Sequence, residues 1–259
     1  MRAAVFACAL ELLVAPPDAG AAPSPPRLEL DHVWIMVTPQ APEREALERI
    51  GLRVSPDVNR HEGQGTASVM VEFPNAFLEL MWPDAGVSIA PGSEKAAEKF
   101  RNRMRWRESG WCPVGIGLRR TKSPETPLPF PTWSIAPAWL PAGASIEMLT
   151  PREDTRSPSL FISPRDPGSA ESPDPNAVHL GKAESDPVFQ HPNRARRLSR
   201  IRLAMPPAYV PIEPLKYLEA TGVLSLSRGD AWGVELVLDG GAKKKMANLR
   251  PTLPLTIRY

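Results

Sequence analysis

Apolar residues in this 259-residue chain form short runs separated by glycine, proline and polar residues. The clearest run, Leu28–Val37, is rich in β-branched and aromatic residues and predicts a buried strand. A helical pattern follows over Pro42–Ile50, and Gly51 suits its left-handed end. Three further strands are predicted, at 52–55, 66–73 and 77–82. The segment 28–82 is therefore interpreted as one β-α-β-β-β unit.

A similar order returns at the C-terminus, where a strand pattern at 197–205 precedes a helical pattern at 213–221. Three strand patterns follow it, at 223–227, 232–238 and 253–259. Between the two units, residues 112–165 show only short strand candidates and are interpreted as a degenerate unit of the same kind. The predicted organisation is a domain over 28–165, a polar linker over 166–197 and a C-terminal unit over 198–259.

The charge balance excludes some classes of partner. Lysine and arginine number 31 against 29 acidic residues, a net charge of +2, so we expect neither nucleic acid nor an anionic membrane as partner. The basic runs RNRMRWR and RARRLSRIR are interleaved with apolar residues, so we expect them to form solvated faces or to cap backbone carbonyls. Proline is frequent, with 32 residues, which favours loops over long helices.

Residues 1–21 have the pattern of an export signal. Arg2 precedes an apolar stretch, and small residues lead to a cleavage pattern at Ala19-Gly20-Ala21. Cleavage would remove Cys8 and leave Cys112 as the single cysteine, so no internal disulfide is expected. We therefore predict a periplasmic or secreted protein with no membrane span after signal removal, and a homodimer stays open.

Two polar residues stand within apolar strands. His32 shares a predicted face with Leu30, Trp34 and Met36, and Glu79 shares one with Phe77 and Met81. An ionised carboxylate on such a face costs roughly several kcal/mol unless it is paired or binds a cation, and imidazole with carboxylate is a common pair of metal ligands. His32 and Glu79 therefore predict a cleft that holds a metal or a ligand. A hydrogen-bonded His–Glu pair in a metal-free cleft is the alternative.

The segments LDHVWIMV, RHEGQGTA and FLELMW resemble the vicinal oxygen chelate superfamily and, within it, the glyoxalase-like domain proteins. The likeness continues through GWCPVGIGLRRT and returns in HPNRARRL. It implies an α+β fold in which repeated βαβββ units form curved open sheets around a cleft, and a divalent metal ion held by His32 and Glu79. The corresponding positions of the other units carry residues that do not complete such a ligand set: Gly115, Ser163, Arg200 and Thr256.

Four other residues are candidates for the site. His61 lies in a glycine-rich turn and Glu147 in SIEMLTP, and either is a candidate proton carrier or further ligand. Glu147 lies on the side opposite its neighbours, so it faces either the cleft or solvent. Trp34 and Trp82 are candidates for a substrate pocket, although core packing explains both equally well.

Two functions follow from these residues. The first is a metal-dependent lyase, isomerase or dioxygenase that binds a small organic molecule in the cleft. The second is a metal-free, non-catalytic protein that binds a small molecule, which the missing ligand positions favour.

Overall fold

The computed structural model describes residues 28–120, 127–137, 140, 142–154, 156–164 and 185–259. The expected signal segment 1–21 and the larger part of the expected linker lie outside these residues. Within the described residues, the helices are too short or too polar to cross a membrane.

The first unit forms half of an eight-stranded sheet with the order β2-β3-β4-β1-β5-β8-β7-β6. Its elements are β1 (Leu28–Met36), α1 (Arg44–Arg49), β2 (Asn59–His61), β3 (Thr66–Phe73) and β4 (Ala76–Pro83). β1 runs parallel to β4, and β2, β3 and β4 form an antiparallel meander. The short strand predicted at 52–55 does not form. Residues 59–61 pair with β3 instead, while Ser55 makes one backbone hydrogen bond to Met70.

The second half of this sheet has the same strand relationships. Its elements are β5 (Val114–Arg120), β6 (Trp133–Ile135), β7 (Ile146–Met148) and β8 (Ser159–Ile162), with β5 parallel to β8. β1 and β5 pair in antiparallel fashion and join the halves. Two helices lie between β4 and β5 in the chain, α2 (Glu94–Met104) and α3 (Trp106–Ser109). The predicted α+β class with repeated strand units is thus confirmed.

The C-terminal residues form a separate five-stranded sheet with the order β10-β9-β11-β13-β12. Its elements are β9 (Leu198–Met205), α4 (Glu213–Ala220), β10 (Ser225–Arg228), β11 (Gly233–Leu238), η3 (Asp239–Gly241), β12 (Met246–Asn248) and β13 (Leu255–Arg258), and η2 (Pro187–Phe189) precedes them. Along the chain, the elements follow the predicted order, with β12 as an additional strand. Within the sheet the arrangement differs from that of the first unit, because β9 lies between β10 and β11.

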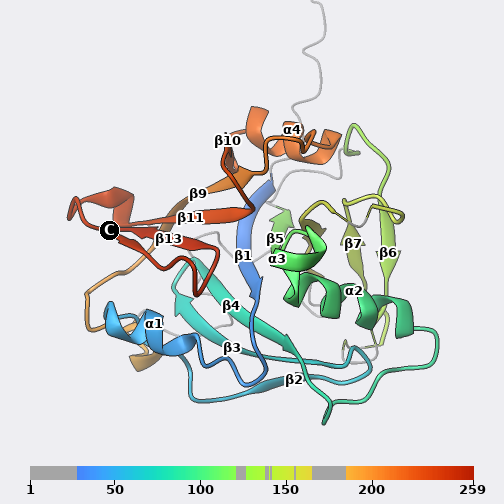
Figure 1. The fold of residues 1–259 in the computed structure, drawn as a ribbon, viewed down its shortest axis with the longest axis horizontal. Coiled ribbons are helices and arrows are strands. Elements are labelled where there is room, and N and C mark those ends of the chain that lie inside the picture. Colours follow the sequence, from blue (N-terminus) through green and yellow to red (C-terminus); the bar gives the residue numbers. More distant parts are fainter. Residues whose placement is uncertain (1–27, 121–126, 138–139, 141, 155, 165–184) are drawn as a thin grey trace, which may run out of the picture.

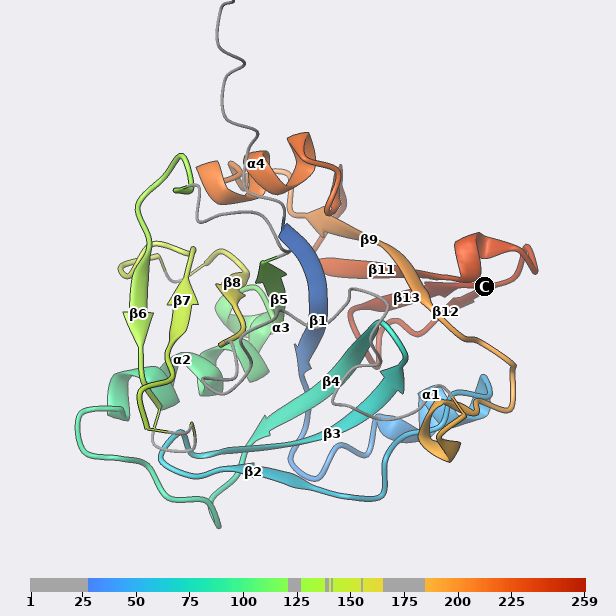
Figure 2. The same cartoon turned by 180° about the vertical axis from the view of Figure 1, so that it is seen from behind.

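The two sheets share one apolar core. Alternate residues of β1 and β4, such as Val33 and Leu80, belong to the same buried cluster as Ile201 of β9 and Leu236 of β11. In Figures 1 and 2 the C-terminal sheet lies beside β1, on the side away from β6 and β7. Asn75, at the β3–β4 turn, joins the sheets through two hydrogen bonds with the backbone of Leu198.

His191 attaches the segment before β9 to the first unit. Its Nδ1 accepts a hydrogen bond from the backbone N–H of Arg53, so its Nε2 carries the proton and donates to the carbonyl of Glu72. The ring is 5% exposed, and burial lowers the pKa of His191, which keeps the ring neutral.

Candidate functional site

The face of the eight-stranded sheet opposite the shared core, here called the inner face, carries His32 and Glu79, the two predicted metal ligands. In the strand register His32 lies beside Phe77, and Trp34 lies beside Glu79. A cavity of about 160 Å³ opens on this face. Its polar lining consists of His32, His61, Gln64, Glu79, Ser159 and Ser163. The structure therefore brings His32, His61 and Glu79 to one cavity, although they come from three strands.

A β-bulge orients His32. The pairing of β1 with β5 shifts between Leu30 and His32, so Leu30 packs on the shared core and not on the predicted face with His32. The bulge also brings the side chain of Asp31 to its neighbour: His32 Nδ1 lies 2.6 Å from Asp31 Oδ1. Ser163 Oγ donates to the same carboxylate oxygen at 3.1 Å. A carboxylate that accepts from Nδ1–H leaves Nε2 of a neutral imidazole as the proton acceptor.

His61 forms a second pair with Glu79. Its Nδ1 lies 2.9 Å from Thr66 Oγ1, and that hydroxyl accepts a hydrogen bond from the Gln64 amide. The nearby Glu79 carboxylate favours the ring proton on Nε2, and the Thr66 hydroxyl then donates to Nδ1. Nε2 lies 3.6 Å from Glu79 Oε1, too far for a direct hydrogen bond. Glu79 is 7% exposed.

Aromatic rings and a glycine fix the His32 ring. Phe77 stacks on it with ring centroids 4.3 Å apart, and Phe161 meets it edge-on at 5.2 Å. Gly117 lies opposite His32 on β5, where an added Cβ would come within 2.4 Å of the imidazole. Gly115 bears the same relation to the indole of Trp34, at 2.0 Å. The two glycines therefore let the side chains of β1 lie across the β5 backbone.

Helix α2 packs on the inner face beside the cavity. Phe100 and Met104 of α2 pack against Trp34, Met36 and Met81 in a small apolar cluster that is separate from the shared core. This helix was not predicted, because its sequence is mostly charged. It supplies Phe100 to the wall of the cavity.

Arg103 holds α2 in place. Its guanidinium is buried and donates to the backbone carbonyls of Cys112, at 2.5 Å, and Ser157, at 2.9 Å. Burial lowers the pKa of Arg103 and raises the pKa of the Cys112 thiol to about 12. Cys112 is therefore a packed thiol and not a nucleophile, and Arg103 has the carbonyl-capping role expected for the RNRMRWR run.

Two of the predicted site residues lie elsewhere. Glu147 projects from β7 away from the cavity, where its carboxylate accepts from Arg120 at 2.8 Å and from Thr132 at 2.9 Å. Its neighbours Ile146 and Met148 line the cavity instead. Trp82 is 2% exposed and belongs to the shared core, whereas Trp34 lines the cavity as expected.

The donor atoms do not form a protein-only metal site. Within the described part of the chain, no group of three or more His, Cys, Asp or Glu side chains is arranged to hold a metal ion. His61 and Glu79 supply one close pair, while Nδ1 of His32 is occupied by Asp31. A structural or catalytic zinc site uses three or four protein ligands, so this set does not fit one.

Sequence reasoning missed the partners of the two histidines. Asp31, Gln64 and Thr66 are polar residues next to predicted site positions, but their roles depend on strand pairing. Ser163 was considered only as a weak ligand, and it donates to Asp31 instead. The one sequence signal available was the Asp-His pair inside an apolar strand.

Comparison with known proteins identifies the family of the chain. A family model described as a glyoxalase-like domain matches residues 30–216. A structure of a hypothetical protein from Staphylococcus aureus is similar, with 8% identity, a TM-score of 0.49, and coverage of 89% of this chain and 99% of that one. No protein with a curated description matches the sequence. Because the family match spans well over half of the residues, the chain belongs to the glyoxalase-like domain family of the vicinal oxygen chelate superfamily.

Proposed function

We propose that the inner-face cavity binds a small organic molecule and exchanges a proton with it. The observation that carries this proposal is the pair of histidines in one partly apolar cavity, each with its ring held by a hydrogen-bonded partner. Side chains held in this way are pre-organised for a ligand, because little freedom is lost on binding. The volume of about 160 Å³ limits the ligand to a small molecule.

In this proposal His32 is the proton acceptor. Asp31 holds the proton of Nδ1 and stabilises the imidazolium that forms when Nε2 takes a proton, and Ser163 keeps the carboxylate in place. The rings of Phe77 and Phe161 exclude water on either side of the imidazole. The chemistry that follows is proton transfer of the isomerase or lyase kind.

His61 and Glu79 form the polar end of the proposed site. The 3.6 Å between Nε2 and Oε1 leaves both atoms able to contact a hydroxyl or carbonyl of the ligand. His61 donates to a ligand oxygen, and Glu79 accepts from a ligand hydroxyl. Divalent metal chemistry would need further ligands from water or substrate, because the described side chains supply only this close pair.

Ligand-observed NMR with a panel of hydroxyketones, hydroxyacids and aldehydes of about two to six carbons tests the proposal. We expect compounds that bind to lose at least about tenfold in affinity in His61→Ala, which removes a hydrogen bond to the ligand, and in Glu79→Gln, which replaces a charged acceptor by a weaker neutral one. Glu147→Gln is the matched control, because its carboxylate lies outside the cavity. Equal losses in all three variants would contradict the assignment.

Elemental analysis separates this function from a metalloenzyme. We expect a chelator to leave ligand binding unchanged in the purified protein. Stoichiometric metal that disappears in both His32→Ala and Glu79→Ala would overturn the metal-free proposal.

We also propose export of the protein. It predicts a mature chain that begins near Ala22, which N-terminal mass spectrometry of the secreted or periplasmic fraction would detect. Full-length cytoplasmic protein would contradict it.

A further inference from the structure

A second and larger cavity lies on the open face of the C-terminal sheet. Its volume is about 570 Å³, within the range of pockets that bind small molecules. The opposite face of this sheet packs into the shared core, so the inner-face cavity and this one lie on different sheets. None of the residues proposed above for small-molecule binding takes part in it.

The lining of this cavity is strongly basic. It contains five cationic side chains and one carboxylate, that of Glu235. The cations are Arg200, Arg202, Lys244, Lys245 and Arg258. The chain has 31 lysines and arginines against 29 acidic residues, whereas this lining has five against one. A concave surface with charges of one sign raises the local concentration of counter-ions.

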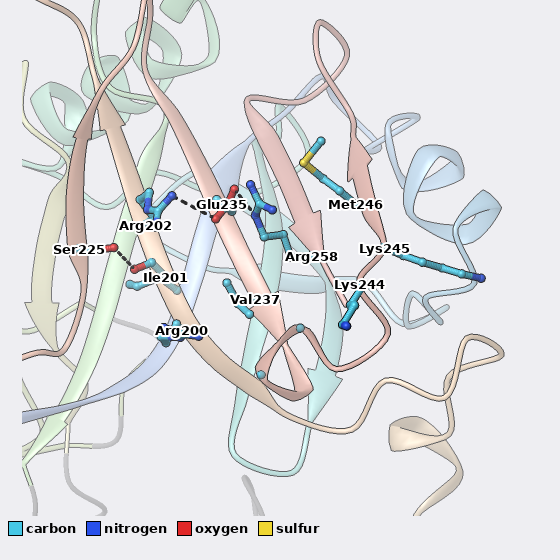
Figure 3. Close-up of a pocket in the computed structure, with 12 residues that line it drawn as sticks. Arg200, Ile201, Arg202, Ser225, Glu235, Val237, Lys244, Lys245, Met246 and Arg258 are labelled. Carbon is cyan, nitrogen blue, oxygen red and sulfur yellow. Dashed lines mark hydrogen bonds and ion pairs between the residues drawn. The ribbon is translucent and has the colours of Figure 1, made fainter.

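Strand pairing sets the positions of the arginines. Arg200 and Arg258 lie on either side of Val237 in neighbouring strands, and Arg202 lies beside Glu235 in the next row. Figure 3 shows Arg202 and Arg258 on the two sides of Glu235, with Lys244 near the η3 turn and Lys245 extending outward.

Glu235 orients two of these guanidiniums without neutralising the group. Its carboxylate lies 2.8 Å from Nε of Arg258 and 3.7 Å from Nη1 of Arg202. Both guanidiniums stay about half exposed, with side-chain exposures of 48% and 51%. Among the described residues, Arg200 and Lys244 have no ion-pair partner. Fixed forks of N–H donors match carboxylate and phosphate oxygens, so the site is pre-organised for such groups.

The cavity also has an apolar rim. Met246, 58% exposed, and Val237 line it beside the charged residues. An exposed methionine next to an arginine cluster suits the carbon skeleton of a ligand better than a bare inorganic ion.

We propose that this basic pocket binds a small organic molecule with at least two anionic oxygen groups, either phosphates or carboxylates. Arg200, Arg202 and Arg258 contact the anionic groups, Lys244 adds charge at the η3 turn, and Val237 with Met246 contacts the carbon part. The site is independent of the inner-face cavity, so either assignment can fail alone.

Isothermal titration calorimetry with pyrophosphate and with citrate, in low-salt buffer, tests the pocket. We expect 1:1 binding of at least one probe, and a loss of at least about tenfold in affinity in Arg200→Gln and in Arg258→Gln. Arg49→Gln is the matched control, because it removes the same charge from an exposed position on α1. Tighter binding of pyrophosphate assigns phosphate groups, and tighter binding of citrate assigns carboxylates.

Two results would overturn the proposal: no binding of either probe at millimolar concentration, or an equal loss in Arg49→Gln. If both small anions fail to bind and a single-stranded oligonucleotide binds in a way that depends on Arg200 and Arg258, the site belongs to nucleic acid instead. A thermal melt of each variant shows that the fold is kept. His61→Ala is expected to leave pyrophosphate binding unchanged, which separates this test from that of the inner-face cavity.

Discussion

Replacing Gly117 by alanine is the sharpest test of how His32 is held. The new Cβ would lie 2.4 Å from Cε1 and 2.6 Å from Nδ1 of the imidazole, where ordinary contacts begin at 3.4 Å. The ring therefore has to move by about 1.0 Å. Phe77 stacks on it at 4.3 Å and Asp31 binds it at 2.6 Å, so that movement compresses one contact and breaks the other.

The expected change in the free energy of unfolding is the balance of two opposing effects. Overpacking of a well-filled site costs about 1–3 kcal/mol, whereas replacing glycine by alanine recovers about 0.4–1 kcal/mol from the unfolded state. We expect Gly117→Ala to lower the free energy of unfolding by about 1–2 kcal/mol in urea denaturation. In the His32→Ala variant the imidazole is absent, so Gly117→Ala should not lower the free energy of unfolding. A double-mutant cycle measures this coupling between Gly117 and His32.

Gly86→Ala provides the control for this prediction. Gly86 is exposed, and its added Cβ would meet only Asp84 Oδ1, at 3.3 Å. We expect its effect to stay within about 0.5 kcal/mol. If Gly117→Ala is as stable as Gly86→Ala and shows no coupling to His32, the imidazole does not lie across β5.

Three further predictions concern the groups that hold the site together. Arg103→Ala should lower the free energy of unfolding by roughly 3–5 kcal/mol in urea, because it leaves two buried carbonyls without a donor, and Arg103→Lys should lose less. The lowered pKa of His191 means that the imidazole takes up a proton in the unfolded chain at a higher pH than in the folded protein. The contribution of neutral His191 to stability is therefore complete above the ordinary pKa of 6.5 and is lost as pH falls through the pKa of the folded protein. His191→Gln should flatten that part of the stability–pH profile; an unchanged profile would contradict the assignment. Asp31→Asn should shift the ¹⁵N spectrum of His32 away from the Nδ1–H tautomer without loss of fold, and an unaltered spectrum would show that Asp31 does not set it.

Much of the fold could be predicted because its strands are short, apolar and bounded by glycine or proline. β1, β3 and β4 appear close to their expected limits. α1 ends at Arg49, two residues before Gly51, whose φ of +79° suits glycine. Helix α2 escaped prediction because its apolar stripe is short and its charged Arg103 points inward. Burial of that arginine depends on two carbonyls that are distant in the sequence.

The candidate site could be predicted only in part. Alternation was enough to group His32 with Trp34 and Met36 on one side of β1, and to place Glu147 opposite Ile146 and Met148 on β7. That His32 and Glu79 share one face depends on the pairing of β1 with β4, which the family resemblance implied. The Asp31 partner could not be predicted, because a bulge arises from the pairing of β1 with β5. The basic run RARRLSRIR was expected to form a solvated face or to cap carbonyls. Its last two arginines, Arg200 and Arg202, lie in β9 and line a cavity, because β11 and β13 place further charges beside them.

The shared core determines the shortest fragment of this protein that can fold. The family match ends at residue 216, inside α4, yet β11 and β13 beyond that point supply side chains to the interior that also contains β1 and β4. A recombinant fragment that stops at the family boundary would leave the back of the large sheet uncovered and open to aggregation. The unit that folds therefore extends to the last strand, whatever the limits of sequence similarity.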